Sequence, residues 1–148
     1  MRVEILWPTI VLVAIVYAVW MTMFVRRLRH LRRNPPIAES FATGEAARRY
    51  FQPVEMPANN LANLFEMPVL YCALVPLLLV THHGNHIQVA LAWIYVLLRG
   101  LHSFIHVGPN KVMPRFGVYL ASCIVLSVMW VGFAIDMAAA ARAMPPGL

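Results

Sequence analysis

The chain has little charge and a small number of acidic residues. Of its 148 residues only 12% are charged and only six are acidic, while 61% are hydrophobic. The mean hydropathy is +0.68. Because about a quarter of the residues of an ordinary soluble domain are charged, this composition excludes a soluble globular protein. We also find no internal repeat and no low-complexity tract.

Two features that are common in secreted proteins are missing, a disulfide framework and a cleavable signal peptide. The two cysteines, Cys72 and Cys123, both fall inside apolar stretches, and we interpret them as small core residues, not as a disulfide or a metal pair. The first apolar stretch is too long for a signal peptide, starts with little positive charge and has no clear cleavage site. We therefore expect it to remain as a membrane anchor.

Four apolar stretches dominate the chain, and each is close to the roughly 20 residues that cross a bilayer as a helix. They are Ile5–Val25, Leu61–Val80, Ile87–His106 and Phe116–Met137. The sequence therefore predicts an all-α integral membrane protein, with one domain over residues 1–148. We expect a bundle of four transmembrane helices at about 5–33, 60–81, 86–107 and 114–140. The first should end where Asn34 meets Pro35 and Pro36.

Positive charge gathers in two of the connections between these helices. The basic residues are Arg26, Arg27, Arg29, Arg32, Arg33, Arg48 and Arg49 in the first connection and Lys111 and Arg115 in the third. By the positive-inside rule both connections are cytoplasmic and both termini lie outside the cytoplasm. The compact loops favour a bacterial inner membrane. A basic run beside a membrane span is explained by topology, so we expect no nucleic-acid partner.

The third apolar stretch carries polar side chains where a lipid-facing helix has none. Tyr95, Arg99, His102 and His106 are spaced four, three and four residues apart, so they share one helical face. An arginine within a bilayer is costly and points to a partner or a wet cavity. This polar stripe therefore predicts a functional site.

The second stretch carries a matching polar face. Glu66 lies 15 residues before Thr81 and Arg99 lies 14 residues after Asn85. A tight turn between them places both about 21–23 Å below that turn. Asn59, Asn63 and Glu66 should therefore face the polar stripe, and we expect Glu66 and Arg99 to form an ion pair. A purely structural clasp and a functional cavity both fit this pairing.

The fourth stretch continues the polar pattern with Arg115, Tyr119 and Ser122. Together the three faces predict a basic cavity for an anionic, water-soluble ligand. His102 and His106 also have the spacing of a two-histidine metal edge. We expect no metal, because histidines hydrogen-bonded to Asn63 or to a polar ligand explain the spacing better.

These motifs resemble those of the MAPEG family, the membrane-associated proteins of eicosanoid and glutathione metabolism, in its bacterial form. The likeness covers nearly the whole chain. It rests on Asn63-Leu64-Phe65-Glu66 and Arg99-Gly100-Leu101-His102, and it continues through His106, Lys111, Arg115 and Tyr119.

The resemblance implies a homotrimer that holds glutathione between subunits, in a cavity that opens toward the cytoplasm. Asn63, Glu66, His102 and Tyr119 would contact the tripeptide, Arg115 would hold its thiolate, and Arg26 or Arg27 would reach a carboxylate. Arg99 and His106 of the polar stripe complete the predicted glutathione-binding set. The implied function is a glutathione-dependent transferase or peroxidase that acts on a lipophilic substrate dissolved in the membrane.

The chain also departs from the family pattern. Asn59 and Ala62 stand where eicosanoid-pathway relatives carry an arginine, His106 stands where a tyrosine is usual, and Phe116 replaces a polar residue. These departures favour an alternative, a non-catalytic scaffold of the same fold that binds a lipid or a partner. Whether the protein is an enzyme stays open at this point.

Overall fold

The computed structural model describes residues 3–143, and all regular secondary structure in that range is helical. The longer elements are α1 (Leu6–Arg33), α2 (Gly44–Phe51), α3 (Met56–Leu64), α4 (Met67–Val80), α5 (His86–Val107) and α6 (Val112–Ala143). Within this range four candidate spans are long and apolar enough to cross a membrane: Val3–Arg33, Met56–Val80, His86–Val107 and Val112–Ala143. The prediction of an all-helical, multi-pass membrane bundle is confirmed.

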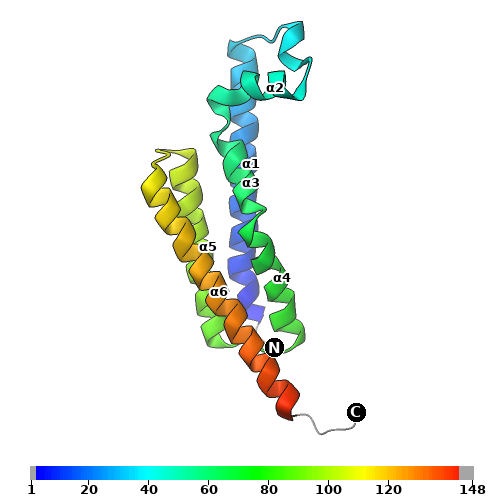
Figure 1. Cartoon of the computed structure of the whole chain (residues 1–148), viewed down its shortest axis with the longest axis vertical. Coiled ribbons are helices and arrows are strands. Elements are labelled where there is room, and N and C mark those ends of the chain that lie inside the picture. The colour runs from blue at the N-terminus through cyan, green and yellow to red at the C-terminus, as the bar shows by residue number, and fades with distance from the viewer. Residues whose placement is uncertain (1–2, 144–148) are drawn as a thin grey trace.

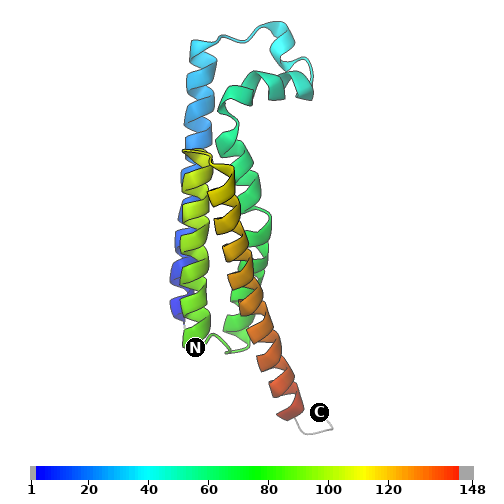
Figure 2. The same ribbon diagram turned by 60° about the vertical axis from the view of Figure 1, so that its left-hand side comes forward.

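The bundle consists of two neighbouring pairs of helices. In Figures 1 and 2, α5 and α6 run side by side as one antiparallel pair, while α3 and α4 follow one another along α1. The start of α1 and the end of α6 lie at the same end of the molecule. At the other end α1 rises above the α5–α6 pair and carries α2 folded back beside it.

Local sequence signals explain where most helices begin and end. α1 ends at Arg33 because the prolines at 35 and 36 cannot continue a helix. α5 begins where the Asn85 side chain accepts a 2.9 Å hydrogen bond from the backbone N–H of Gln88, a standard N-cap. The chain reaches that cap through a tight turn in which His82 has a φ of 59°.

The second span differs from the single helix that we predicted over 60–81. It begins earlier, at Met56, and is interrupted at Phe65 and Glu66, between α3 and α4. Pro68 explains the interruption, because it has no N–H to bond the carbonyl of Leu64 and its ring would clash with that carbonyl in a continuous helix. Pro68 is instead accommodated in the first turn of α4.

An apolar core holds the half of the bundle that contains α4. Tyr71 and Tyr95 stack with their ring centroids 5.0 Å apart, and the Tyr71 hydroxyl lies 3.0 Å from that of Thr9. Around them pack Ile5, Leu12, Leu74, Leu78, Ala92, Leu126 and Met129. Our interpretation of both cysteines as core residues is wrong for Cys72, whose side chain is exposed on α4, and both thiols are free.

The long first connection folds against the end of α1. It contains two short 3₁₀ turns, η2 (Ala38–Phe41) and η3 (Gln52–Val54), on either side of α2. The Tyr50 hydroxyl donates to the carbonyl oxygen of Asn34, and the Arg27 guanidinium lies 4.9 Å from the centre of the Phe51 ring. These contacts hold the connection above the bundle.

Candidate functional site

The polar stripe predicted on α5 lies on the buried face of that helix. Tyr95, Arg99, His102 and His106 are all buried, and Arg99 is 0% exposed. Burial of four hydrogen-bonding side chains in a row is unusual for a membrane helix, because each must be satisfied inside the protein. The structure therefore keeps a polar layer between the helices.

Arg99 uses this position to bond the interrupted backbone of the second span. Its Nη2 donates a 2.8 Å hydrogen bond to the carbonyl oxygen of Asn63. In an unbroken helix that carbonyl would accept from the N–H of Met67, but the break between α3 and α4 removes this partner. The guanidinium carbon of Arg99 also lies 5.7 Å from the centre of the Tyr119 ring, a cation–π arrangement.

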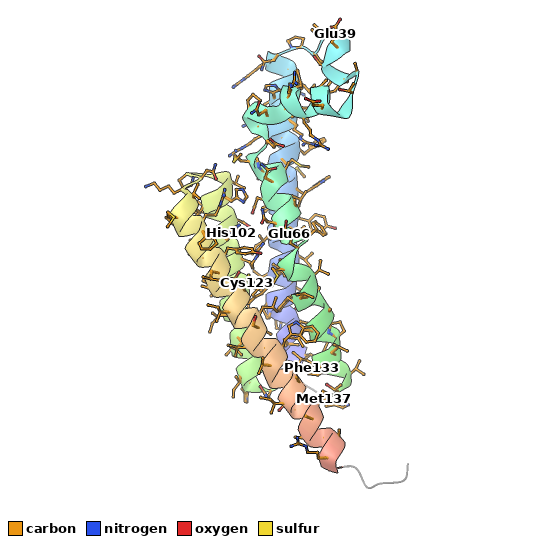
Figure 3. All side chains as sticks on the ribbon, viewed as in Figure 1. Glu39, Glu66, His102, Cys123, Phe133 and Met137 are labelled. Atoms are coloured by element: carbon orange, nitrogen blue, oxygen red, sulfur yellow. The ribbon has the colours of Figure 1, made fainter. Side chains whose placement is uncertain are left out.

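The predicted ion pair between Glu66 and Arg99 is wrong. Glu66 lies at the junction of α3 and α4, where its side chain is exposed, and among residues 3–143 it forms no ion pair. The depth count assumed a continuous helix, whereas the chain is interrupted at Phe65 and Glu66, and the Glu66 carboxylate does not reach ion-pair distance of Arg99. Figure 3 shows Glu66 and His102 at similar heights in the bundle.

Five of the predicted site residues meet in one pocket of about 270 Å³ between α3, α5 and α6. Its lining consists of Asn63, His102, His106, Val112, Met113, Arg115, Phe116 and Tyr119. The pocket lies near the end of the bundle where α5 passes into α6. It combines imidazole, guanidinium, amide and phenol groups, which suit an anionic and hydrogen-bonding ligand.

Two histidines form one wall of the pocket. The ring centroids of His102 and His106 are 5.6 Å apart, and the His102 ring is 5.7 Å from that of Tyr119. Nδ1 of His102 lies 3.2 Å from the carbonyl oxygen of Arg115. Because a carbonyl can only accept, this nitrogen carries the hydrogen. Nε2 is then the acceptor, and it has no partner among the described residues.

Arg115 is held at the pocket by the turn that precedes α6. Its Nη1 donates a 2.6 Å hydrogen bond to Oδ1 of Asn110, which has a φ of 47°. The turn also requires Gly108, since a Cβ there would lie 2.9 Å from the carbonyl oxygen of Phe104. Asn110 therefore positions the predicted catalytic arginine, a role that our sequence reasoning missed. Its place between Pro109 and the basic residues was the available signal.

Asn60 and Ser103 form a second polar contact that the sequence did not reveal. Both are buried, and the Ser103 hydroxyl lies 3.4 Å from Oδ1 of Asn60. Asn63 faces α5 as expected and lines the pocket with His102 and His106, while its Nδ2 also donates a 2.9 Å hydrogen bond to the backbone carbonyl of Asn59. Asn60 is therefore the asparagine of α3 whose side chain is completely buried against α5.

Three predicted residues do not line this pocket. They are Arg99, which is buried, Glu66, which is exposed at the junction of α3 and α4, and Arg26, which lines a different pocket. Nη2 of Arg26 donates a 3.1 Å hydrogen bond to the carbonyl oxygen of Val107, the last residue of α5. Within one chain, the groups that we assigned to a single ligand therefore occupy separate surfaces.

The residues that the structure describes contain no cluster of three or more histidine, cysteine, aspartate or glutamate side chains placed to hold a metal ion. His102 and His106 accordingly have no further ligand of these types beside them. The two rings lie at 86° to each other, with the carbonyl of Arg115 and the ring of Tyr119 as their neighbours.

Comparison with known proteins agrees with this arrangement. The model of the MAPEG family matches residues 5–135, a range that contains all four spans in part or in full and every predicted site residue. The chain belongs to the MAPEG family. No curated protein and no solved structure matches it. MAPEG proteins include glutathione-dependent transferases and peroxidases, and they are typically membrane trimers.

Proposed function

We propose that this MAPEG protein is a glutathione-dependent transferase or peroxidase that acts on a lipophilic substrate dissolved in the membrane. The observation that supports the proposal is the pocket in which Arg115, His102, His106, Asn63 and Tyr119 converge. Glutathione has two carboxylates, an ammonium group and a thiol, so it requires cations, acceptors and amides together. The pocket and its surroundings supply these groups.

Arg115 is the proposed catalytic residue. A thiol with an ordinary pKa of about 8.5 is mostly protonated at neutral pH, and a neighbouring guanidinium favours the reactive thiolate. Nη1 of Arg115 is engaged by Asn110, which leaves the other terminal nitrogen of its fork to face the sulfur. Nε2 of His102 and the amide of Asn63 would then position the peptide.

In the transferase reaction the thiol first loses its proton to solvent. The thiolate sulfur attacks the electrophilic carbon, a carbon–sulfur bond forms, and the leaving group departs with its electron pair. In the peroxidase reaction the sulfur attacks the hydroperoxide and the O–O bond breaks, giving an alcohol and a glutathione sulfenic acid. A second glutathione reduces this acid to disulfide and water.

The separation of the proposed ligand groups supports a homotrimer. Glu66 is exposed and Arg26 lies on another face, so one chain does not surround a glutathione molecule. In an assembly the exposed carboxylate of one subunit and the helix-one arginine of its neighbour can complete the pocket. Glu66 would accept from the glutathione ammonium group, and Arg26 would bond a carboxylate.

The test is turnover of a chlorodinitrobenzene-type electrophile by the purified full chain. Arg115→Ala should lower the rate of conjugation at least 100-fold, in the range expected when a group that stabilises developing charge is removed. Lys111→Ala is the matched control, because it removes a neighbouring cation from the same turn and should change the rate less than about twofold. Unchanged turnover in Arg115→Ala would show that Arg115 is not a catalytic residue.

A non-catalytic scaffold is the second candidate, and Phe116 favours it. This side chain lines the pocket beside Arg115 and is 59% exposed, so part of the pocket wall is apolar. A scaffold would bind a lipid or a partner helix in this pocket and would not bind glutathione. Thermal unfolding with and without millimolar glutathione separates the two functions, since only a glutathione enzyme gains stability by mass action.

A further inference from the structure

We infer that the extension of α1 beyond the bundle forms a second, separate binding site, which takes a phosphate group of the kind that an anionic phospholipid carries. The site is a pocket of about 290 Å³ lined by Arg26, Arg29, His30, Arg33, Asn34 and Val54. It shares no lining residue with the pocket around Arg115. Arg26 lines this pocket and is also assigned to glutathione under the proposed function, so the inference is argued from Arg29, His30 and Arg33, which the proposed function does not use.

The basic residues of this pocket lie on one face of α1. Positions 26, 29, 30 and 33 follow the i, i+3, i+4, i+7 pattern of a single helical stripe. The positive-inside rule requires only charge near the membrane, in any arrangement. It does not explain why four basic side chains share one face and line a concave surface. Arg27, one residue away, is turned instead onto the Phe51 ring.

The donors of the pocket are available for a ligand. Arg29 and Arg33 make no hydrogen bond or ion pair with any described residue, and no carboxylate of residues 3–143 pairs with the stripe. Nδ2 of Asn34 lies 3.3 Å from Nδ1 of His30. Because an amide nitrogen donates, Nδ1 accepts and Nε2 carries the hydrogen. Two guanidinium forks and one imidazole N–H therefore remain to bind oxygen atoms.

The height of the pocket matches that of lipid phosphates. Arg26 bonds the carbonyl of Val107, the last residue of α5, and so marks the level at which a span leaves the bilayer. From there to Arg33 α1 rises about 10 Å, into the zone of the head groups. Guanidinium groups bond phosphate oxygens in pairs, and basic pockets at this level bind anionic head groups. Val54 adds an apolar edge suited to a glycerol backbone.

The test measures phospholipid binding to the purified full-length protein in neutral detergent, by native mass spectrometry. Phosphatidylglycerol should bind saturably, and Arg29→Gln with Arg33→Gln should weaken its affinity at least tenfold, since hydrogen bonds to charged groups are strong. The matched control, Arg32→Gln with Arg48→Gln, removes two exposed cations outside the pocket and should weaken it less than threefold. Arg29→Lys with Arg33→Lys keeps the charge and should bind with intermediate affinity.

Further measurements identify the source of the phosphate and separate this site from the glutathione site. If soluble glycerol phosphate binds with the same dependence on Arg29 and Arg33, the phosphate site stands and its ligand is a soluble ester. The inference would be overturned if phosphatidylglycerol did not bind saturably. It would also be overturned if the Arg29→Gln, Arg33→Gln protein and the Arg32→Gln, Arg48→Gln control lost equal affinity for the lipid. Glutathione conjugation by the Arg29→Gln, Arg33→Gln protein should be unchanged.

Discussion

Arg99 and Asn63 are joined by a hydrogen bond from a buried guanidinium to a backbone carbonyl, 2.8 Å long. The bond replaces the helical hydrogen bond that the break between α3 and α4 removes. Irregular backbone is tolerated at this depth of a membrane protein only where other protein groups satisfy it. Arg99 therefore makes the interruption possible, and the interruption places Glu66 on the surface.

The first prediction concerns which partner Arg99 needs. Arg99→Met leaves the Asn63 carbonyl buried without a donor, so the free energy of unfolding should fall by about 1–3 kcal/mol. Glu66→Gln should change it by less than about 0.5 kcal/mol, because Glu66 is exposed and forms no ion pair with any residue between 3 and 143. Unfolding in mixed micelles without glutathione measures both values. If both variants lost a similar, large part of the free energy of unfolding, Glu66 and Arg99 would have to form an ion pair after all.

The second prediction concerns the break itself. Pro68→Ala restores an N–H that can bond the carbonyl of Leu64, so the second span should become more continuous and its amides at 65–69 better protected from hydrogen exchange. Stabilisation by glutathione should decrease because Glu66 rotates. Pro76→Ala is the control, since Pro76 lies inside α4 and away from the junction. If Pro68→Ala left both exchange and glutathione binding unchanged, Pro68 would not cause the break.

The third prediction concerns the different roles of the two ring nitrogens of His102, Nδ1 in stability and Nε2 in glutathione binding. Asparagine can keep a donor near Nδ1, so His102→Asn should retain the bond to the Arg115 carbonyl and unfold within about 0.5 kcal/mol of the natural protein. Glutamine reaches toward Nε2 and loses that bond, so His102→Gln should be less stable by about 1 kcal/mol. Glutathione-induced shifts in Tm should follow the opposite order. A shared loss of binding and stability in both variants would show that the whole ring is needed for packing.

The fourth prediction concerns topology. In a background of Cys72→Ser and Cys123→Ser, a cysteine at Ser40 should be protected from a membrane-impermeant maleimide in intact cells. A cysteine at His83 should be labelled. The expectation follows from the basic residues around Ser40 and the positive-inside rule. If only the cysteine at Ser40 were labelled, the orientation would be the opposite of the expected one, and the pocket around Arg115 would lie outside the cytoplasm.

Much of the architecture was predictable because hydrophobic length and periodicity are local properties of the chain. Helix three was expected at 86–107, and α5 occupies His86–Val107. The polar stripe on that helix is buried as its spacing indicated. The second span was less predictable, because its hydrophobicity continues through a position where Pro68 breaks the hydrogen-bond ladder. The position of this proline, and not the composition of the segment, sets the helix boundary.

The sequence by itself determined the membrane location, the ends of most spans and the polar face of α5, since each follows from residue type and helical spacing. Only the tertiary structure decided which partners those polar groups take. Arg99 bonds a carbonyl and not a carboxylate, Asn60 replaces Asn59 inside the bundle, and Asn110 holds Arg115. These outcomes depend on the interruption between α3 and α4 and on the turn before α6. The contacts of Arg99 and Asn60 also depend on packing between segments that are distant in sequence.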